Sequence, residues 1–210
     1  MTTTEEPWTR LAFAEAAAWN LAVVEDVPAE RWDGPGLGVW TLRELVAHTS
    51  RAYTTITTYL RPAGEPDIPD AASYFVRAIA GGDRAAIHAG VAERGRAEAA
   101  AFADDPAGEL ARRARAARTA IDEAPAGAVC ESFVGTLALD DYLVTRVVEL
   151  VLHTLDIVAA AGLPDDIPPP PATRLAAEVV TALGVATAPV AVLRTLTGRA
   201  PWPEGASIFG

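Results

Sequence analysis

Features that would assign a chain to several common classes are scarce or missing in this sequence. The only cysteine is Cys130, which excludes an internal disulfide framework and is compatible with a reducing compartment. No segment has the uncharged apolar length that a membrane span needs. The first residues, MTTTEEPW, lack the basic start and apolar stretch of a secretion signal. We therefore expect a cytoplasmic protein.

Positively charged residues are also few compared with negatively charged ones. The sequence has 17 Lys plus Arg residues against 28 Asp plus Glu residues, which gives a formal net charge of −11. An excess of negative charge repels phosphate backbones and anionic membrane surfaces. Neither nucleic acid nor a membrane is therefore expected as a partner.

What the sequence does contain is helical periodicity, and no strand-like alternation is sustained. The 210 residues, half of them hydrophobic, suffice to bury the core of one domain with an appendage. Thr41 and Glu44 form a capping-box pattern at the start of one helix. The expected helices span residues 7–26, 41–60, 72–80, 83–123 with a break near Asp104–Pro106, 138–161 and 172–187, followed by a shorter helical piece.

These segments predict an all-α fold, an antiparallel bundle of four long helices with a short helical C-terminal extension. The bundle is expected in residues 1–162, and a Pro-rich linker with the helical extension in residues 163–210. Residues 125–135 are expected to form a loop, and the tail TGRAPWPEGASIFG to be exposed.

The helix expected over residues 138–161 carries one polar stripe in apolar surroundings. Arg146, Glu149, His153 and Asp156 are spaced by three, four and three residues, so they line up along one side of the helix. Because the segment VVELVLHTLDIV is apolar almost all the way round, we expect it in the middle of the core. A buried carboxylate there is costly unless it is paired with a charge or bound to a cation.

His48 can supply a third ligand, because it lies on the flank of its helix's apolar stripe. Together with Glu149 and His153 it would form a His₂Glu metal site with one coordination position free. The alternative is a histidine that hydrogen-bonds Glu149 without a metal. Arg146 would then be an ion-pair partner of Glu149, and Asp156 would orient His153; both roles also fit residues that support metal ligands.

Two segments, WTLRELVAH at 40–48 and DYLVTRVVELVLHTLD at 141–156, resemble the mycothiol-dependent maleylpyruvate isomerase family, within the DinB-like superfamily of thiol-dependent metalloproteins. The resemblance covers most of the chain and includes LTGR at 196–199. Members are four-helix bundles that hold a divalent metal, commonly zinc. The resemblance implies that His48, Glu149 and His153 are the metal ligands, and it matches Asp156 to a catalytically important aspartate.

The resemblance also implies a chemistry. A metal with an open position can bind mycothiol or another low-molecular-weight thiol and lower its pKa, and the thiolate can add to an electrophilic carbon. The ligand set suits zinc, nickel and iron alike. Cys130 lies outside the polar stripe and is expected to be a packing thiol. The partners expected are the thiol and a small electrophile, with the protein a monomer or homodimer.

One departure from the family concerns an arginine. The founding isomerase carries a second domain that supplies an essential arginine, whereas this chain has a short extension. Arg199 or Arg194 could supply the charge, or could contact helix carbonyls. We expect an S-transferase or isomerase; the alternative is a metal- or small-molecule-binding bundle without catalysis.

Overall fold

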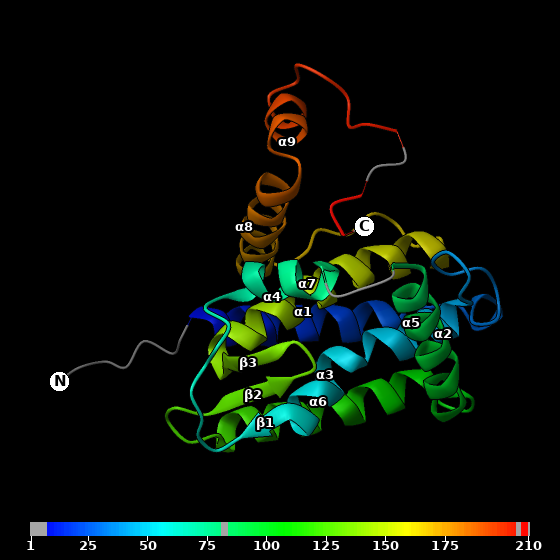
Figure 1. Cartoon of the computed structure of the whole chain (residues 1–210). Coiled ribbons are helices and arrows are strands. Elements are labelled where there is room, and N and C mark those ends of the chain that lie inside the picture. The colour runs from blue at the N-terminus through cyan, green and yellow to red at the C-terminus, as the bar shows by residue number, and fades with distance from the viewer. Residues whose placement is uncertain (1–7, 81–83, 205–206, 210) are drawn as a thin grey trace.

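The computed structural model describes residues 8–80, 84–204 and 207–209, and it is predominantly helical with one small sheet (Figure 1). This agrees with the all-α class predicted from the sequence. The longer helices are α1 (Trp8–Glu25), α5 (Arg84–Ala99), α6 (Pro106–Glu123), α7 (Leu139–Ala161) and α8 (Pro170–Thr187). The shorter ones are α2 (Leu42–Thr49), α3 (Arg51–Tyr59), α4 (Ala71–Ala80), α9 (Pro189–Leu196) and the 3₁₀ turns Ala29–Arg31 and Ala100–Phe102.

Helix α7 lies in the middle of the molecule, where it packs against α1, α2, α3, α4 and α8. Helix α6 packs on α1 and α3, on the opposite side of the molecule from α8 (Figure 1). Burial of apolar side chains between these helices is the main favourable contribution to folding. The largest fully buried side chains of this core include Leu45, Tyr53, Ile56, Leu110, Leu143, Leu150 and Ile157.

A buried chain of hydrogen bonds ties three of these helices together. The Tyr53 hydroxyl on α3 donates to Asn20 Oδ1 on α1 at 2.9 Å, and Asn20 Nδ2 donates to Thr154 Oγ1 on α7 at 2.9 Å. All three residues are fully buried. Buried polar groups are stable only when hydrogen-bonded, so this network favours one alignment of the three helices.

Local capping signals mark several of the helix boundaries. Thr41 and Glu44 form the complete capping box at the start of α2. Asp105 accepts a hydrogen bond from the backbone N–H of Gly108, with Pro106 in the first turn of α6, which confirms the expected break. Helix α7 ends at Gly162, whose φ of 70° is a left-handed conformation that glycine adopts most easily.

The prediction of one helix over residues 41–60 is wrong, because α2 ends at Thr49 and α3 begins at Arg51. At the junction, Thr49 Oγ1 donates to the Leu45 carbonyl and Ser50 Oγ donates to the Ala47 carbonyl. Such side-chain bonds compete with the helical backbone pattern and often bend a helix. His48 consequently lies in the last turn of a short helix.

The prediction of a loop over residues 125–135, with no strands, is also wrong. Strand β2 (Val129–Ser132) pairs antiparallel with β3 (Gly135–Ala138), and β1 (Leu60–Arg61) pairs with β2. Asp67 holds this hairpin by accepting a hydrogen bond from the Thr136 backbone N–H at 2.6 Å. Strands this short show too little alternation to be recognised in the sequence.

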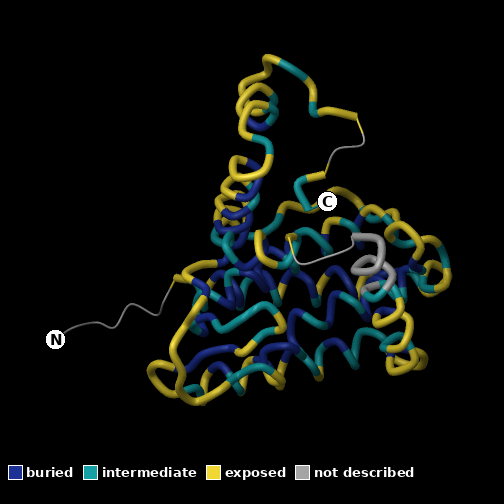
Figure 2. The backbone as a smooth tube through the Cα atoms, in the orientation of Figure 1, coloured by how far each residue is buried: buried dark blue, intermediate teal, exposed yellow. Residues whose placement is uncertain are grey.

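The C-terminal segment is only partly exposed (Figure 2). Helix α8 buries Leu175 and Leu183 in the main core, and α9 packs on α8. Most described residues of the tail are exposed, as predicted, but the Phe209 ring packs edge-on against Phe75 at 5.5 Å between centroids. The proposed domain boundary coincides with the end of α7 and stays a prediction. Among the described helices, none has the length and apolarity to cross a membrane.

Candidate metal centre

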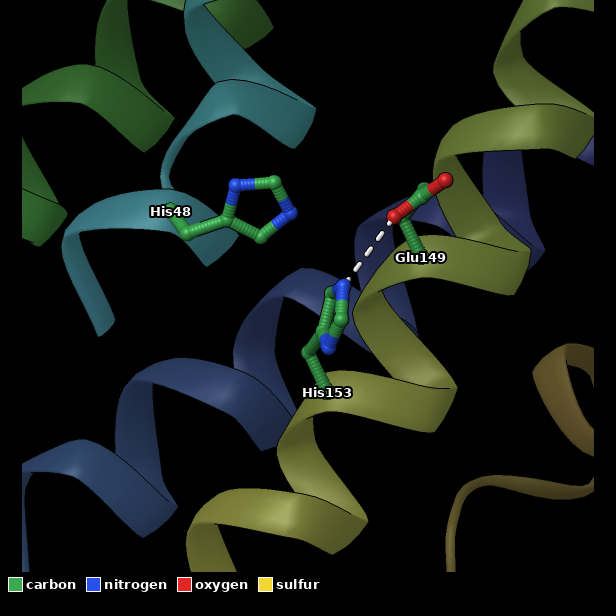
Figure 3. Close-up of side chains that lie close together, drawn as sticks. All are labelled: His48, Glu149 and His153. Carbon is green, nitrogen blue, oxygen red and sulfur yellow. Dashed lines mark ion pairs between the residues drawn. The ribbon is translucent and has the colours of Figure 1, made fainter. Parts of the chain in front are cut away.

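Helices α2 and α7 bring the three predicted ligands together. His48 lies in the last turn of α2, and Glu149 and His153 lie one turn apart on α7. One nitrogen or oxygen atom from each of them lies within 4.8 Å of the other two (Figure 3). Two imidazoles and a carboxylate are the donor set of many three-ligand metal sites, so these residues fit a divalent metal.

His153 is held at both ring nitrogens. Its Nε2 lies 3.2 Å from Glu149 Oε2, and its Nδ1 lies 3.2 Å from Asp156 Oδ2. Asp156 therefore orients His153, as the stripe on α7 predicted. Metal-binding histidines commonly donate their other ring N–H to a carboxylate, which aims the free nitrogen at the metal. The contact of Nδ1 with Asp156 matches that arrangement, and it directs Nε2 toward Glu149.

His48 is positioned by aromatic stacking. Its ring lies 4.5 Å from the Trp40 ring at an interplanar angle of 29°, and 5.0 Å from the His153 ring, edge to face. Trp40 is fixed in turn, since its Nε1 donates to the Ala92 carbonyl on α5 at 3.2 Å. Sequence reasoning did not single out Trp40 as part of the site. The only signal for it was its position in the segment that carries the family resemblance.

The alternative for His48 was a hydrogen bond to Glu149 without a metal, and no such bond is present among the described residues. Its Nδ1 is buried without a partner there. Figure 3 shows the other ring nitrogen pointing toward Glu149. A His48 nitrogen directed into the cluster, with no hydrogen bond to Glu149 there, favours the metal interpretation over the purely structural one.

The charges of the cluster are strongly coupled. Burial and the neighbouring His153 lower the pKa of His48 to about 3, so His48 is neutral at ordinary pH. Burial alone would lower the pKa of His153, but its hydrogen bonds to Asp156 and Glu149 raise it to about 9. Burial alone would raise the pKa of Glu149, but the hydrogen bond from His153 and the charge of Arg146 lower it. Without a metal, His153 therefore carries a positive charge between the side chains of Glu149 and Asp156.

The stripe is less buried than the sequence predicts. The side chain of Glu149 is 30% exposed and that of His153 is 17% exposed. Helix α7 is central, but its polar stripe faces a side that the neighbouring helices do not fully cover. The cost of leaving the Glu149 carboxylate without a bound cation is therefore smaller than full burial would make it. Both side chains therefore keep some contact with solvent.

The ion pair between Arg146 and Glu149, which belonged to the same alternative, is also absent: no ion pair among the described residues involves Arg146. The Arg146 guanidinium instead lies 4.8 Å from the centroid of the Tyr142 ring and donates to Thr145 Oγ1 at 3.0 Å. It affects Glu149 only as a nearby charge.

The arginines of the extension lie elsewhere. Arg194 belongs to α9 and Arg199 follows it, and both are exposed. Figure 1 shows α9 at the far end of α8, away from α2. The structure therefore brings together His48, Glu149, His153 and Asp156, and leaves Arg199 apart from them. A catalytic role for Arg199 stays a prediction.

Comparison with known families gives a match over most of the molecule. Residues 13–158 match the model of the mycothiol maleylpyruvate isomerase N-terminal domain. The chain belongs to this family. The matched span runs from α1 to near the end of α7, so it includes the whole His48–Glu149–His153 cluster and Asp156. No curated protein and no solved structure matches the chain.

Proposed function

We propose that this protein is a metal- and thiol-dependent S-transferase or isomerase that acts on a small electrophile. The bundle formed by α1, α2–α3, α6 and α7 is proposed to be the DinB-like antiparallel four-helix bundle. The observation that carries the proposal is the cluster of His48, Glu149 and His153, with one ligand atom from each within 4.8 Å of the others. Membership of the mycothiol isomerase family supports the choice of a thiol as co-substrate.

These residues would hold the metal through two imidazole nitrogens and one carboxylate oxygen. When bound, zinc, nickel or iron with an open position supplies Lewis acidity that lowers the pKa of a thiol such as mycothiol. Asp156 keeps the proton of neutral His153 on Nδ1, so that Nε2 presents its lone pair to the cluster. Trp40 holds the His48 ring in place and covers one of its faces.

Cys130 is unsuited to act as the nucleophile in place of an added thiol. It lies on β2, fully buried, and burial raises the pKa of its thiol to about 12. A thiol with so high a pKa is almost entirely protonated at neutral pH. The thiolate must therefore come from a diffusible molecule, which agrees with the proposed dependence on mycothiol or a comparable thiol.

The metal assignment is tested by elemental analysis of purified variants. The wild-type protein should carry close to one divalent metal per chain, and His153→Ala should lose it because two ligand atoms bind far more weakly than three. Asp122 is an exposed aspartate of α6, so Asp122→Ala is the control. Unchanged metal content in His153→Ala would exclude the proposed ligand set.

The reaction class is tested with a panel of electrophiles assayed with and without mycothiol. Turnover should require both the metal and the thiol, and Asp156→Asn should keep the metal while turnover falls. Arg199→Ala tests the proposed contribution of the extension to substrate binding. Metal-bound protein that is inert across the panel would instead identify a non-catalytic metal- or small-molecule-binding protein.

A cytoplasmic location, the absence of nucleic-acid or membrane partners, and a monomeric or dimeric state stay predictions.

A further inference from the structure

The indole of Trp40 joins helix α5 to the candidate metal centre. Its ring is stacked on that of His48, with 4.5 Å between the ring centroids. Its Nε1 donates to the Ala92 carbonyl on α5 at 3.2 Å. Helix α5 also packs against α2, the helix that carries His48 (Figure 1). The indole therefore connects one of the proposed ligands to a helix that carries none of them.

Gly95 on α5 gives this indole its room. The glycine is buried, and a Cβ atom at this position would lie 2.9 Å from Trp40 Nε1 and 3.1 Å from Trp40 Cε2. Ordinary van der Waals contact begins at 3.4 Å, so a Cβ atom 2.9 Å away would be about 0.5 Å too close. Glycine inside a helix is less stable than alanine, so a buried glycine in α5 calls for a packing reason. The close approach of Trp40 supplies that reason.

The backbone of Trp40 is held as well, which limits how the residue can yield. Its N–H donates to the Leu37 carbonyl at 3.0 Å, and its carbonyl accepts from the Gly36 N–H at 2.8 Å. The next residue, Thr41, is the N-cap of α2 and belongs to its capping box. Pressure on the indole must therefore turn the ring about its side-chain bonds. The ring then moves against the residue stacked on it, which is His48.

A small displacement of His48 matters because the geometry of a metal site is narrow. One donor atom from each proposed ligand lies within 4.8 Å of the others, and the His48 ring lies edge to face with the His153 ring at 5.0 Å. Metal–ligand distances are held to within about 0.2 Å. Relief of the contact at residue 95 requires a movement of about 0.5 Å, from 2.9 Å to 3.4 Å. Half of that movement, passed on to His48, would exceed the tolerance.

We propose that Gly95 is a positioning residue of the candidate metal centre. Its missing side chain lets the Trp40 indole lie against α5, and the indole sets the place of His48. The affinity for the metal is thereby tuned from a helix that provides no ligand. The coupling between Gly95 and His48 stands on the packing contacts alone, while its effect on metal binding rests on the proposed function.

The test compares two Gly→Ala substitutions in α5 of the full-length protein. Gly95→Ala should weaken zinc binding about tenfold or more, measured in competition with a chromophoric chelator, because changing a group that orients a ligand commonly has an effect of about this size. Gly90→Ala is the matched control, since a Cβ atom there would be in ordinary contact with Arg94 Nη1 at 3.4 Å. It should leave zinc affinity unchanged, while the melting temperature stays the same or rises.

A second measurement, on the chelated protein, separates the coupling from metal binding. The ring current of Trp40 shifts the NMR signals of the His48 ring protons stacked against it, and His48→Gln identifies these signals. Gly95→Ala should move them at constant pH, and Gly90→Ala should not. If the wild-type protein binds no zinc, the proposed function fails, and the His48 signals still test the role of Gly95.

A smaller ring at position 40 tests the route through the indole. Phenylalanine lacks Nε1, Cε2 and Cζ2, the indole atoms nearest to Gly95. The double variant Gly95→Ala/Trp40→Phe should therefore bind zinc more tightly than the two single losses multiplied together predict. If Gly95→Ala alone does not fold, the double variant should fold, because the smaller ring leaves space for the methyl group.

Three outcomes would overturn the proposal. Unchanged His48 signals in Gly95→Ala would mean that the glycine does not act on this ligand, whatever the zinc affinity. An equal loss of zinc affinity in Gly90→Ala would show that any added methyl group in α5 has the same effect. Losses that simply multiply in the double variant, or a double variant that also fails to fold, would place the defect in α5 itself and not in its contact with Trp40.

Discussion

Metal binding to the His48–Glu149–His153 cluster should release one proton at neutral pH, and that proton should come from His153. Without a metal, hydrogen bonds to Asp156 and Glu149 outweigh burial and raise the pKa of His153 to about 9. A metal can bind only the neutral imidazole. His48 is already neutral and Glu149 is already ionised, so neither gives up a proton.

The magnitude follows from the pKa of His153. With a pKa of about 9, only about one His153 in a hundred is neutral at pH 7. The apparent metal affinity at pH 7 is then about a hundredfold below its limit at high pH, or about 2.7 kcal/mol. Affinity should therefore rise about tenfold per pH unit between pH 6.5 and 8.5, and level off above the pKa of His153.

Calorimetric titration of the chelated protein with zinc measures both quantities. The heat measured in two buffers with different ionisation enthalpies counts the protons released, and a series from pH 6.5 to 9.5 gives the slope. Asp156→Asn removes one of the groups that raise the pKa of His153, so its affinity should level off at a lower pH. Asp122→Asn, which changes an exposed aspartate of α6, is the control.

Two results would refute this reasoning. Affinity that does not depend on pH, with no proton released, would mean that His153 is neutral before the metal binds or is not a ligand. Release of two protons at pH 7 would mean that His48 is protonated as well, against the effect of its burial beside Trp40 and His153.

Three further predictions concern stability and turnover. Glu149→Ala should abolish the metal-dependent rise in melting temperature. In the wild-type protein this rise reflects a stabilisation of about 2.7 kcal/mol at a hundredfold excess of metal over Kd. Melting curves with and without chelator measure it, and an equal loss of stability in both states would indicate a purely structural Glu149. Tyr53→Phe should lower the free energy of unfolding by about 1–3 kcal/mol in urea titrations, because it leaves the buried Asn20 oxygen without its donor; no change would contradict the role of the network. Cys130→Ala should retain thiol-dependent turnover, and its loss would make the buried thiol part of the reaction.

Helices were predictable from the sequence because their signals are local. The periodicity of α7, the capping box at Thr41 and the break near Pro106 each depend on residues within a few positions of one another. The hairpin was missed because its strands have four residues each, and the third strand, Leu60–Arg61, lies about seventy positions before its partner. Such pairing is decided by tertiary contacts, which no local pattern records.

The candidate site was likewise predictable from the sequence only in part. Glu149 and His153 share a helix face, so their spacing predicted that they lie together. The approach of His48 depends on the packing of α2 against α7, and the sequence suggested it only through family resemblance. The stacking of Trp40 and the orientation of Arg146 toward the tyrosines instead of Glu149 are side-chain outcomes of that packing. They could not be read from spacing.

The hydrogen-bond chain from Tyr53 through Asn20 to Thr154 also affects how the residues of the cluster are aligned. Thr154 directly follows His153, and Tyr53 lies five positions after His48, so the chain fixes both ligands against the common reference of α1. A slip of α7 by one residue would move His153 by about 1.5 Å, far beyond the roughly 0.2 Å tolerance of metal–ligand bonds. Neither the hairpin nor the extension contributes a residue to this chain of hydrogen bonds, so we expect insertions there to leave the His48–Glu149–His153 cluster aligned.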